Sequence, residues 1–461
     1  MDNREHFSSR IGFILMTAGC AIGLGNIWRF PYIAGANGGG FFVLLYLFFL
    51  AILGFPVLVM ELALGRAGQQ TLPGAMQMLH NGKKSGFWKV IGYLLFSGNF
   101  FLLMFYFPVT GWLTAYSFYM LDGTLAPAAG AAVDYGAFLG GFLDSAPRQI
   151  IFTIPVLLLT AMLCFGGLRK SVEKSIKVMM TGLFLLLVAL IVKALAMPGA
   201  GRGVEFFLLP KLENMDISGV VNAVHAAMAQ AFFTLSLGVG SVALCGSYIG
   251  KDRSLSGEAI WIISLDTLVA IAAGLIIFPC CFEFGVSPDA GPKLIFVTLP
   301  QVFSRMALGR WWGSVFFIFL TIAALSTLVA VFENLVAFGM DNWSWSRHKS
   351  VLFFGAALAI CSLPCIFGFN IWKSFEPLGR GKNILDLEDF IVSDNLLPLG
   401  ALLIAIFCIW SFGWGEKKFF AEVNSGNGVR LSQKIILYLR YILPLLVALL
   451  WLAGLGIFKI G

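Results

Sequence analysis

Long apolar runs dominate the chain and recur along its whole length. Short polar segments separate them, and nothing shows the alternating apolar and polar strands of an outer-membrane barrel. Stretches long enough to cross a membrane as helices cover about residues 11–35, 41–68, 87–121, 149–166, 174–197, 220–249, 257–284, 310–340, 350–369, 393–414 and 435–459. The pattern therefore predicts an all-α, polytopic membrane protein with eleven transmembrane helices.

The composition excludes other classes of protein. The 461 residues are 59% hydrophobic and 12% charged, with a mean hydropathy of +0.88. Soluble domains carry about 25% charged residues, so this chain has too little polar surface to be a soluble, disordered or secreted protein. The first apolar run continues from Ile11 beyond Phe30 without a cleavage site, which predicts a retained helix and no signal peptide. We expect a single transmembrane domain over residues 1–461.

Basic residues form small clusters between the apolar runs, so they bear on orientation and not on nucleic acid. The net charge is +7, from 31 Lys and Arg and 24 Asp and Glu. With the N-terminus inside, cytoplasmic segments hold 19 of the 31 basic residues, the opposite side holds 11, and Arg29 lies within the first helix. This bias predicts a multi-pass protein of the inner (plasma) membrane with a cytoplasmic N-terminus and an extracytoplasmic C-terminus.

Residues for enzyme chemistry are sparse. The eight cysteines lie in apolar segments without paired metal-ligand spacing, and the four histidines are scattered. The run GLGNIW from Gly23 follows no predicted strand and does not fit a dinucleotide-binding fingerprint. We predict no enzyme activity and no catalytic residues. The weaker alternatives are an intramembrane enzyme using Glu61, Asp266 or Arg29, and an ion channel, which needs a continuous pore.

The first and sixth helices contain glycine-rich interruptions. These are GCAIGLG over residues 19–25 and FTLSLGVG over residues 233–240. Each glycine weakens a helix by about 1 kcal/mol relative to alanine, which favours local unwinding. Irregular backbone at this depth must be buried in protein or line a cavity. The alternative is that the glycines only permit close helix packing.

The positions of the two interruptions correspond in two five-helix halves. This predicts an inverted repeat, with residues 11–197 and 220–414 as the halves and 435–459 as an extra helix. This pattern is described chiefly for one transporter fold, so it is not independent support for that fold.

Unwound segments offer ligands for both ends of an amino acid. Free N–H groups at half-helix N-termini suit a carboxylate, and free carbonyls suit an ammonium group or a small cation. Oxygen donors for sodium are the carbonyls from Gly19 to Ile22, the Asn26 amide, the Thr234 hydroxyl, and the hydroxyls of Ser326 and Thr327. Such hydroxyls more often bond to their own helix, so that alternative stays open for Ser326 and Thr327.

Four charged residues lie at membrane depth, namely Arg29, Glu61, Asp266 and Glu333. Each costs about 3 kcal/mol or more at the centre of the bilayer, which marks it as functional by default. The alternative is that they pair with one another to hold helices together. Asp389 precedes the tenth helix and is placed to meet Arg29 near the outer mouth, as a gate.

Several motifs carry a resemblance to a known family. They are Arg4-Glu5-His6-Phe7, GLGNIWRFPYIAGANGGG at 23–40, ELALGR at 61–66 and QAFFTLSLGVG from Gln230. With them, nearly the whole chain resembles the bacterial branch of the neurotransmitter:sodium symporter family. The resemblance implies a leucine-transporter-type fold, a 5+5 inverted repeat with discontinuous helices 1 and 6. Many relatives have twelve helices, and animal members have a cysteine pair in the long outer loop that this chain lacks.

The resemblance also implies two sodium sites. The ligands of the first are the Ala21 carbonyl, Asn26, Thr234 and Asp266. The ligands of the second are the carbonyls of Gly19, Ile22 and Ala323 with the hydroxyls of Ser326 and Thr327. We further expect the fixed charge of Asp266 to replace the chloride that animal relatives use.

The resemblance implies a substrate site and two gates as well. The amides of Leu24 and Gly25 and the Tyr106 hydroxyl meet the substrate carboxylate, and carbonyls near Ala21, Phe233 and Thr234 with Ser236 meet its ammonium group. The pocket is completed by Leu102, Val239, Thr327 and Val331, with Phe233 as a lid. The outer gate pairs Arg29 with Asp389, and the inner gate pairs Arg4 with Asp341.

Together these features predict a sodium-coupled symporter that works by alternating access. Gly23 stands where monoamine transporters have an aspartate, so the substrate needs its own carboxylate. Val239 is small, which leaves room for a neutral, hydrophobic or aromatic L-amino acid. We expect two Na⁺ per substrate, no chloride, and the lipid bilayer as surroundings, with no nucleic-acid partner. The runner-up is a proton-coupled amino-acid transporter of the same fold.

Overall fold

We describe the protein from a computed structural model. The described residues are 7–80, 86–127, 133–211, 216–286 and 293–455. They are nearly all helical, and their β pairing is limited to two isolated bridges, Gly39 with Pro210 and Arg253 with Asn427. The prediction of an all-α protein is confirmed.

The long helices account for most of the predicted spans. Nine are long and apolar enough to cross a membrane within the described residues, and the bent pair α1 and η1–α2 makes a tenth. The nine are α3–η2–α4 (Gly40–Gly68), α6 (Gly86–Leu121), α8 (Ala146–Phe165), η3–α9 (Leu168–Leu195), α13 (Leu255–Glu283), α15 (Gly309–Trp343), α16–α17 (Arg347–Phe367), α18–η5–α19 (Ile384–Ile409) and η6–η7–α21 (Gln433–Gly454). The sixth predicted helix is represented by the shorter α11 (Ile217–Phe233) and α12 (Ser241–Ser247), so the number eleven stays a prediction.

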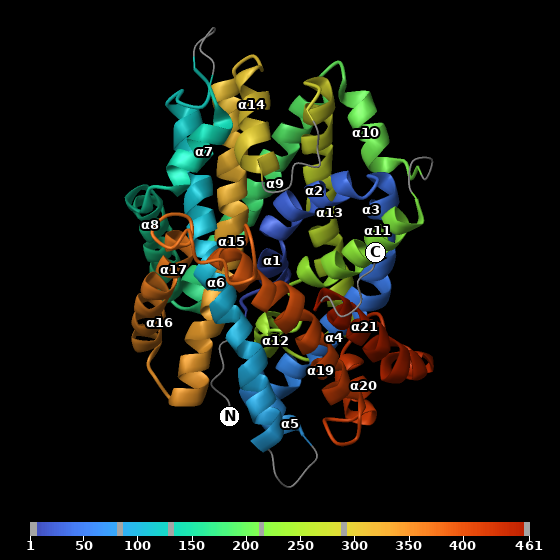
Figure 1. The fold of residues 1–461 in the computed structure, drawn as a ribbon. Coiled ribbons are helices and arrows are strands. Elements are labelled where there is room, and N and C mark those ends of the chain that lie inside the picture. Colours follow the sequence, from blue (N-terminus) through green and yellow to red (C-terminus); the bar gives the residue numbers. More distant parts are fainter. Residues whose placement is uncertain (1–6, 81–85, 128–132, 212–215, 287–292, 456–461) are drawn as a thin grey trace.

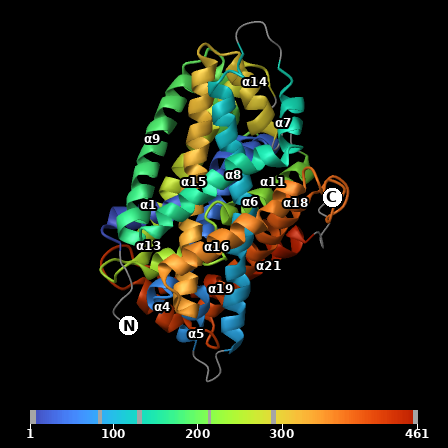
Figure 2. The ribbon, with the colours of Figure 1, turned by 90° about the vertical axis from the view of Figure 1, so that its left-hand side faces the viewer.

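Shorter helices close the two ends of the bundle. Figures 1 and 2 place α7 (Tyr135–Leu143) and α14 (Leu299–Ser304) at one end and α5 (Leu72–Leu79) at the other. The remaining short helices are α10 (Ala200–Leu208) and α20 (Glu416–Val423). In both views the long helices run between these ends, as a membrane protein requires.

The first span is broken where the glycines predict it. Helix α1 (Arg10–Ala21) stops, and the chain resumes as the wide turn η1 (Gly25–Arg29) and α2 (Phe30–Ala36), with a bend of 55°. A Cβ atom at Gly23 would collide with the Tyr106 hydroxyl and would lie 2.6 Å from the Thr327 hydroxyl. The absence of a side chain therefore lets the break approach both neighbouring helices.

The sixth predicted helix is also broken. Residues 234–240 separate α11 from α12, and Ser236, Gly238 and Gly240 all have positive φ, at 50°, 102° and 81°. Glycine adopts this backbone region without strain, which explains why glycine is found at positions 238 and 240. Discontinuous first and sixth helices are thus confirmed, while the division into halves 11–197 and 220–414 stays a prediction.

The tenth span differs from its predicted bounds. It covers Ile384–Ile409, where the pattern predicts 393–414. A reciprocal cap starts it: Asn383 accepts a hydrogen bond from the Asp386 N–H at 3.2 Å, and Asp386 accepts one from the Asn383 N–H at 2.7 Å. The acidic first turn hides the start of the helix from a hydropathy pattern. Asp389 therefore lies on a helix, at the end of α18 (Ile384–Asp389), and not in the preceding loop.

A buried arginine joins distant segments near α20. Arg66, in the last turn of α4 (Phe55–Gly68), donates to the Glu422 carboxylate, the Arg253 carbonyl and the Ser425 hydroxyl, each at 2.7 Å. It also donates to the Glu422 carbonyl. The bridge between Arg253 and Asn427 lies beside this cluster. Arg66 therefore fastens α20 and the segment before α13 to the end of α4.

Glu333 forms an ion pair of its own. Its carboxylate, in α15, accepts from Arg347 of α16 at 2.7 and 2.8 Å, and Arg347 also donates to the Cys164 carbonyl at 2.9 Å. Glu333 is fully buried. The pair ties α15, α16 and α8 together, so this intramembrane charge holds helices together, with Arg347 and not with Arg29.

Candidate functional site

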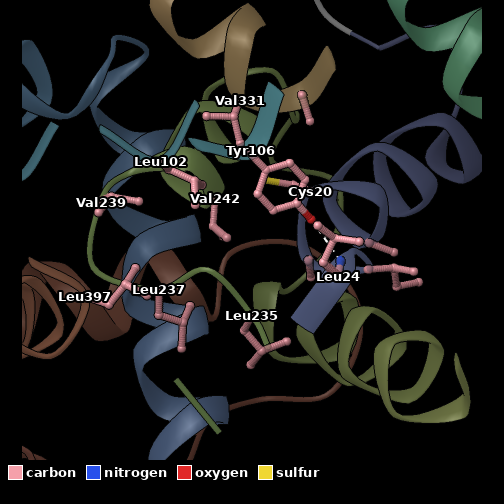
Figure 3. Packing of buried hydrophobic residues seen from close by; sticks show 14 of the residues in the cluster. Cys20, Leu24, Leu102, Tyr106, Leu235, Leu237, Val239, Val242, Val331 and Leu397 are labelled. Atoms are coloured by element: carbon pink, nitrogen blue, oxygen red, sulfur yellow. Dashed lines mark hydrogen bonds between the residues drawn. The ribbon is translucent and has the colours of Figure 1, made fainter. Parts of the chain in front are cut away.

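The two helix breaks meet α6 and α15 in the centre of the bundle. The Tyr106 hydroxyl of α6 accepts a hydrogen bond from the Leu24 N–H at 2.8 Å, which Figure 3 shows as a dashed line. A Cβ atom at Gly25 would lie 2.8 Å from the Phe233 ring. Leu24, Gly25, Tyr106 and Phe233, which the resemblance placed in the substrate site, therefore lie together.

A buried carboxylate organises one side of this centre. Asp266 of α13 accepts from the Asn26 amide at 2.8 Å and from the Thr234 hydroxyl at 2.9 Å, and Asn26 also donates to Thr234 at 3.0 Å. All three side chains are 0% exposed. In the described part of the chain, no Lys, Arg or His nitrogen lies within the 4.0 Å ion-pair limit of Asp266. An isolated buried carboxylate is costly, so this one needs a cation or a proton.

Two further residues complete this cluster, and the sequence reasoning missed both. The Tyr46 hydroxyl of α3 (Gly40–Phe49) lies 3.4 Å from the Asp266 carboxylate. Gln230 of α11 donates to the Gly25 carbonyl at 3.0 Å, and its own buried amide oxygen accepts no hydrogen bond from the described part of the chain. Gln230 is the first residue of the QAFFTLSLGVG motif, so the motif could have indicated a role for it. No sequence feature distinguishes Tyr46 from other tyrosines.

A second group of oxygens lies between α1 and α15. The Thr327 hydroxyl lies 3.2 Å from the carbonyls of Gly19 and Ile22, and the Ser326 hydroxyl lies 3.4 Å from that of Gly19. Ser326 also donates to Ala323, in its own helix, at 2.8 Å. The structure therefore brings together all five groups of the predicted second sodium site. The alternative of bonding within the helix also holds for Ser326.

The central cavity is small and lies beneath a larger outer one. A cavity of about 20 Å³ is lined by residues of both breaks together with Leu102, Tyr106, Thr327, Val392 and Leu397. The outer cavity measures about 380 Å³. Phe233 and Tyr106 line both cavities. In this conformation the central cavity has room for about one water molecule and not for an amino-acid side chain.

Three predicted pocket residues contribute differently. Ser236 lines the small cavity, whereas Val239 and Val331 are fully buried and do not line it. Val239 packs against Gly98, where a Cβ atom would lie 2.5 Å from its methyl carbon. Ala21 lines the cavity from the first break. Val392 of η5 (Phe390–Leu396) and Leu397 of α19 (Leu397–Ile409) also line the cavity, and neither was predicted from the sequence.

The residues of the predicted outer gate both line the outer cavity. Asp389 accepts a hydrogen bond from the Ser393 hydroxyl at 2.5 Å, and the Arg29 guanidinium lies 4.1 Å over the Phe233 ring. No ion pair joins Arg29 to Asp389 among the described residues. At the inner gate, Arg4 lies outside the described residues, and Asp341 accepts from the Thr71 N–H at 2.8 Å.

Glu61 supports the second break from behind. It is fully buried in α4 and accepts a hydrogen bond from the Gly238 N–H. Its other carboxylate oxygen has no hydrogen-bond partner among the described residues. Of the functional and structural interpretations of this intramembrane charge, the geometry favours a role in holding the unwound backbone.

The chain is similar to known transport proteins over nearly its whole length. The family model described as "Sodium:neurotransmitter symporter family" matches residues 4–132 and 147–459. An uncharacterized sodium-dependent transporter of Bacillus subtilis (strain 168), YhdH, is 32% identical over 453 residues, which are 98% of each chain. The sodium- and chloride-dependent taurine transporter of Homo sapiens is 25% identical over 457 residues, covering 89% of this chain and 72% of that one. The crystal structure of MhsT in complex with L-phenylalanine matches with a TM-score of 0.86 and 37% identity, covering 98% of this chain and all of MhsT.

Proposed function

This chain belongs to the sodium:neurotransmitter symporter family, and we propose that it takes up a neutral, hydrophobic or aromatic L-amino acid together with two sodium ions. It is a sodium-dependent membrane transporter and not an enzyme. The substrate, the number of ions and the residues that bind them are the parts we propose.

The observation that carries the proposal is the buried Asp266 carboxylate. It is surrounded by the neutral groups of Asn26, Thr234 and Tyr46 and has no basic partner among the described residues. A sodium ion bound here would neutralise the charge of the Asp266 carboxylate, and the surrounding oxygen atoms would serve as its ligands. The Asn26 amide nitrogen now faces Asp266, while its oxygen accepts from the Gly23 N–H at 3.2 Å. We therefore expect the amide to turn its oxygen toward the ion when sodium binds.

The second ion is supported by the oxygens between α1 and α15. Two hydroxyls and three carbonyls converge there. Sodium in transporters of this type is coordinated by unwound carbonyls. Because the Gly19 carbonyl lies in the last turn of α1 and the Ile22 carbonyl in the break that follows, an ion bound there stabilises the broken helix against α15.

The substrate assignment rests on the first break and the cavity wall. The N–H groups of Leu24 and Gly25 begin the half-helix that continues into α2, and such ends favour a carboxylate. Gly23 has no space for a side chain, so the carboxylate must come from the substrate. Leu102 and Leu397 give the small cavity an apolar wall. MhsT, at 37% identity, is bound to L-phenylalanine in its crystal structure, which also favours a hydrophobic substrate.

Transport requires the central cavity to widen and the outer one to close. The Phe233 ring lines both cavities, so we expect it to move when the side chain of the substrate enters the central one. Closure then brings Arg29 toward Asp389, and rocking of the first, second, sixth and seventh helices opens the inside. With two sodium ions, a 100 mV potential supplies about 2.3 kcal/mol per charge. A tenfold gradient adds about 1.4 kcal/mol per ion, which together permits roughly 10⁵-fold accumulation.

The same buried carboxylate also favours a second candidate, because a proton would neutralise Asp266 as well as sodium does. Uptake of labelled phenylalanine into proteoliposomes separates the two. We expect uptake driven by an inward sodium gradient, without chloride, and competition by hydrophobic and aromatic amino acids. Equal uptake driven by a pH gradient alone would overturn sodium coupling, and competition only by glycine or charged amino acids would overturn the substrate class.

A further inference from the structure

We propose that Asn99 of α6 is a positioning residue that sets the shape of the substrate side-chain pocket by fixing the backbone of the second helix break. The inference rests on the proposed function, since it concerns which amino acids the pocket accepts. Asn99 is fully buried and lies outside both predicted sodium sites. It does not line the central cavity, so it acts through other residues.

The Asn99 amide is fully used in bonds that hold the break. Its nitrogen donates to the Val239 carbonyl at 2.8 Å and to the Phe96 carbonyl, within α6, at 2.9 Å. Its oxygen accepts a hydrogen bond from the Ser241 hydroxyl at the start of α12. The Asn99 side chain therefore binds the end of the unwound segment at Val239 and the start of α12 at Ser241, and so connects α6 to both.

The same turn of α6 also carries a wall of the pocket. Leu102 follows Asn99 by three residues, so the two share one face of the helix. Leu102 lines the central cavity, and Figure 3 shows it near Val239 in the buried cluster. The bond from Asn99 to Val239 thus fixes the spacing between this wall and the unwound segment.

Close packing prevents the segment from moving sideways. A Cβ atom at Gly98 would lie 2.5 Å from the Val239 side chain, and one at Gly400 of α19 would collide with the Gly238 carbonyl. The segment is therefore held in a slot between α6 and α19. Leu397, whose carbonyl closely approaches Gly238, also lines the central cavity. A shift along the slot would change the cavity. Asn99 opposes such a shift through the Val239 carbonyl, as Glu61 does through the Gly238 N–H.

Asparagine suits the contacts with Val239 and Ser241 because its amide group both donates and accepts hydrogen bonds. The side chain must donate to a carbonyl and accept from a hydroxyl with one planar group. Aspartate keeps the acceptor but turns a carboxylate oxygen toward the Val239 carbonyl, and alanine leaves both partners without their bond. Ser241 provides a matched partial change, because its removal leaves the bond to Val239 in place.

The test compares uptake of phenylalanine with that of valine in proteoliposomes at saturating sodium. We expect Asn99→Ala and Asn99→Asp to change the ratio of the two kcat/KM values by about tenfold, with the half-saturating sodium concentration changed by less than about twofold. Ser241→Ala should retain the wild-type ratio. Ser97→Ala serves as the control, since this exposed hydroxyl bonds only to its own helix in the structure.

Three outcomes decide the proposal. An unchanged ratio in Asn99→Ala, or an equal loss for both substrates, would show a merely structural residue and overturn it. If the Asn99 variants do not fold, Gly98→Ala tests the same idea from the neighbouring position of α6, where a Cβ atom would press on the Val239 side chain, and an unchanged ratio there would also overturn it. Failure of the wild type to transport either amino acid would instead refute the proposed function.

Discussion

The Arg29 guanidinium rests on the Phe233 ring, 4.1 Å from its centroid. Both residues line the outer cavity, and one guanidinium nitrogen of Arg29 is buried without a hydrogen-bond partner among the residues that the structure describes. The contact between the guanidinium and the face of the ring is a cation–π interaction, which contributes about 0.5–2 kcal/mol. Arg29 is therefore held over the lid and remains available to a carboxylate.

We first predict that Arg29 and Asp389 act as partners during closure. Arg29→Gln and Asp389→Asn should each lower the turnover of uptake by about tenfold or more, because closure of the outer cavity loses its ion pair. The double variant should be little worse than either single one, since coupled residues are not additive. Initial uptake rates at saturating substrate measure this. Losses that multiply in the double variant would show that the two residues act separately.

The second prediction concerns the charge of Asp266. Asp266→Asn removes the carboxylate that compensates the first ion, so the half-saturating sodium concentration should rise by about tenfold or more, which corresponds to about 1.4 kcal/mol. Chloride should then stimulate uptake by supplying the missing charge. Sodium titrations with chloride or gluconate as anion measure both effects. Unchanged sodium affinity and no gain in chloride dependence would contradict the assignment.

The third prediction separates the second ion from the first. Thr327→Ala combined with Ser326→Ala removes two oxygen ligands between α1 and α15, so uptake should lose its coupling to sodium. Thr321→Ala is the matched control, because the Thr321 hydroxyl in the same helix bonds only to the Phe317 carbonyl at 2.8 Å in the structure. Binding of radioactive sodium to purified protein should fall in the double variant and remain unchanged in the control. Equal binding in both would remove this site.

The fourth prediction is about stability. Arg347→Met leaves the Glu333 carboxylate buried without its ion pair, and breaking a buried pair costs about 3–5 kcal/mol. The Arg347→Met variant should therefore unfold at a lower temperature in detergent. Adding Glu333→Leu removes the buried carboxylate that has lost Arg347 and should restore most of the stability. No recovery in the double variant would show that packing, and not charge, explains the loss.

The helix breaks could be predicted from the sequence because their cause is local. Glycines near Gly23 and Gly238 weaken the helix wherever the chain goes, and the structure shows the close contacts and positive φ values that require them. Asn26, Thr234 and Asp266 could be assigned only through the family resemblance, because nothing local places them together.

The sequence missed residues whose roles depend on distant contacts. Tyr46 reaches Asp266 across 220 positions, and Asn99 reaches Val239 across 140. The sequence predicts that Val239 lines the pocket. In the structure its side chain packs against α6 instead, because Gly98 has no side chain to prevent this contact. The hydropathy pattern missed the start of α18 because the first turn of this helix is acidic. Hydropathy measures only polarity, so it does not detect the helix cap formed by Asn383 and Asp386.

The buried guanidinium of Arg66 links folding to the order of synthesis. Its partner Glu422 comes 356 residues later in the chain. At about 5–20 residues per second, the arginine waits on the order of 20–70 s for its carboxylate while the membrane helices between them are made. A nascent chain that ends before Glu422 retains an unpaired arginine at the end of α4. The ion pair therefore forms only after synthesis has passed Glu422, so it is one of the last contacts that the end of α4 acquires.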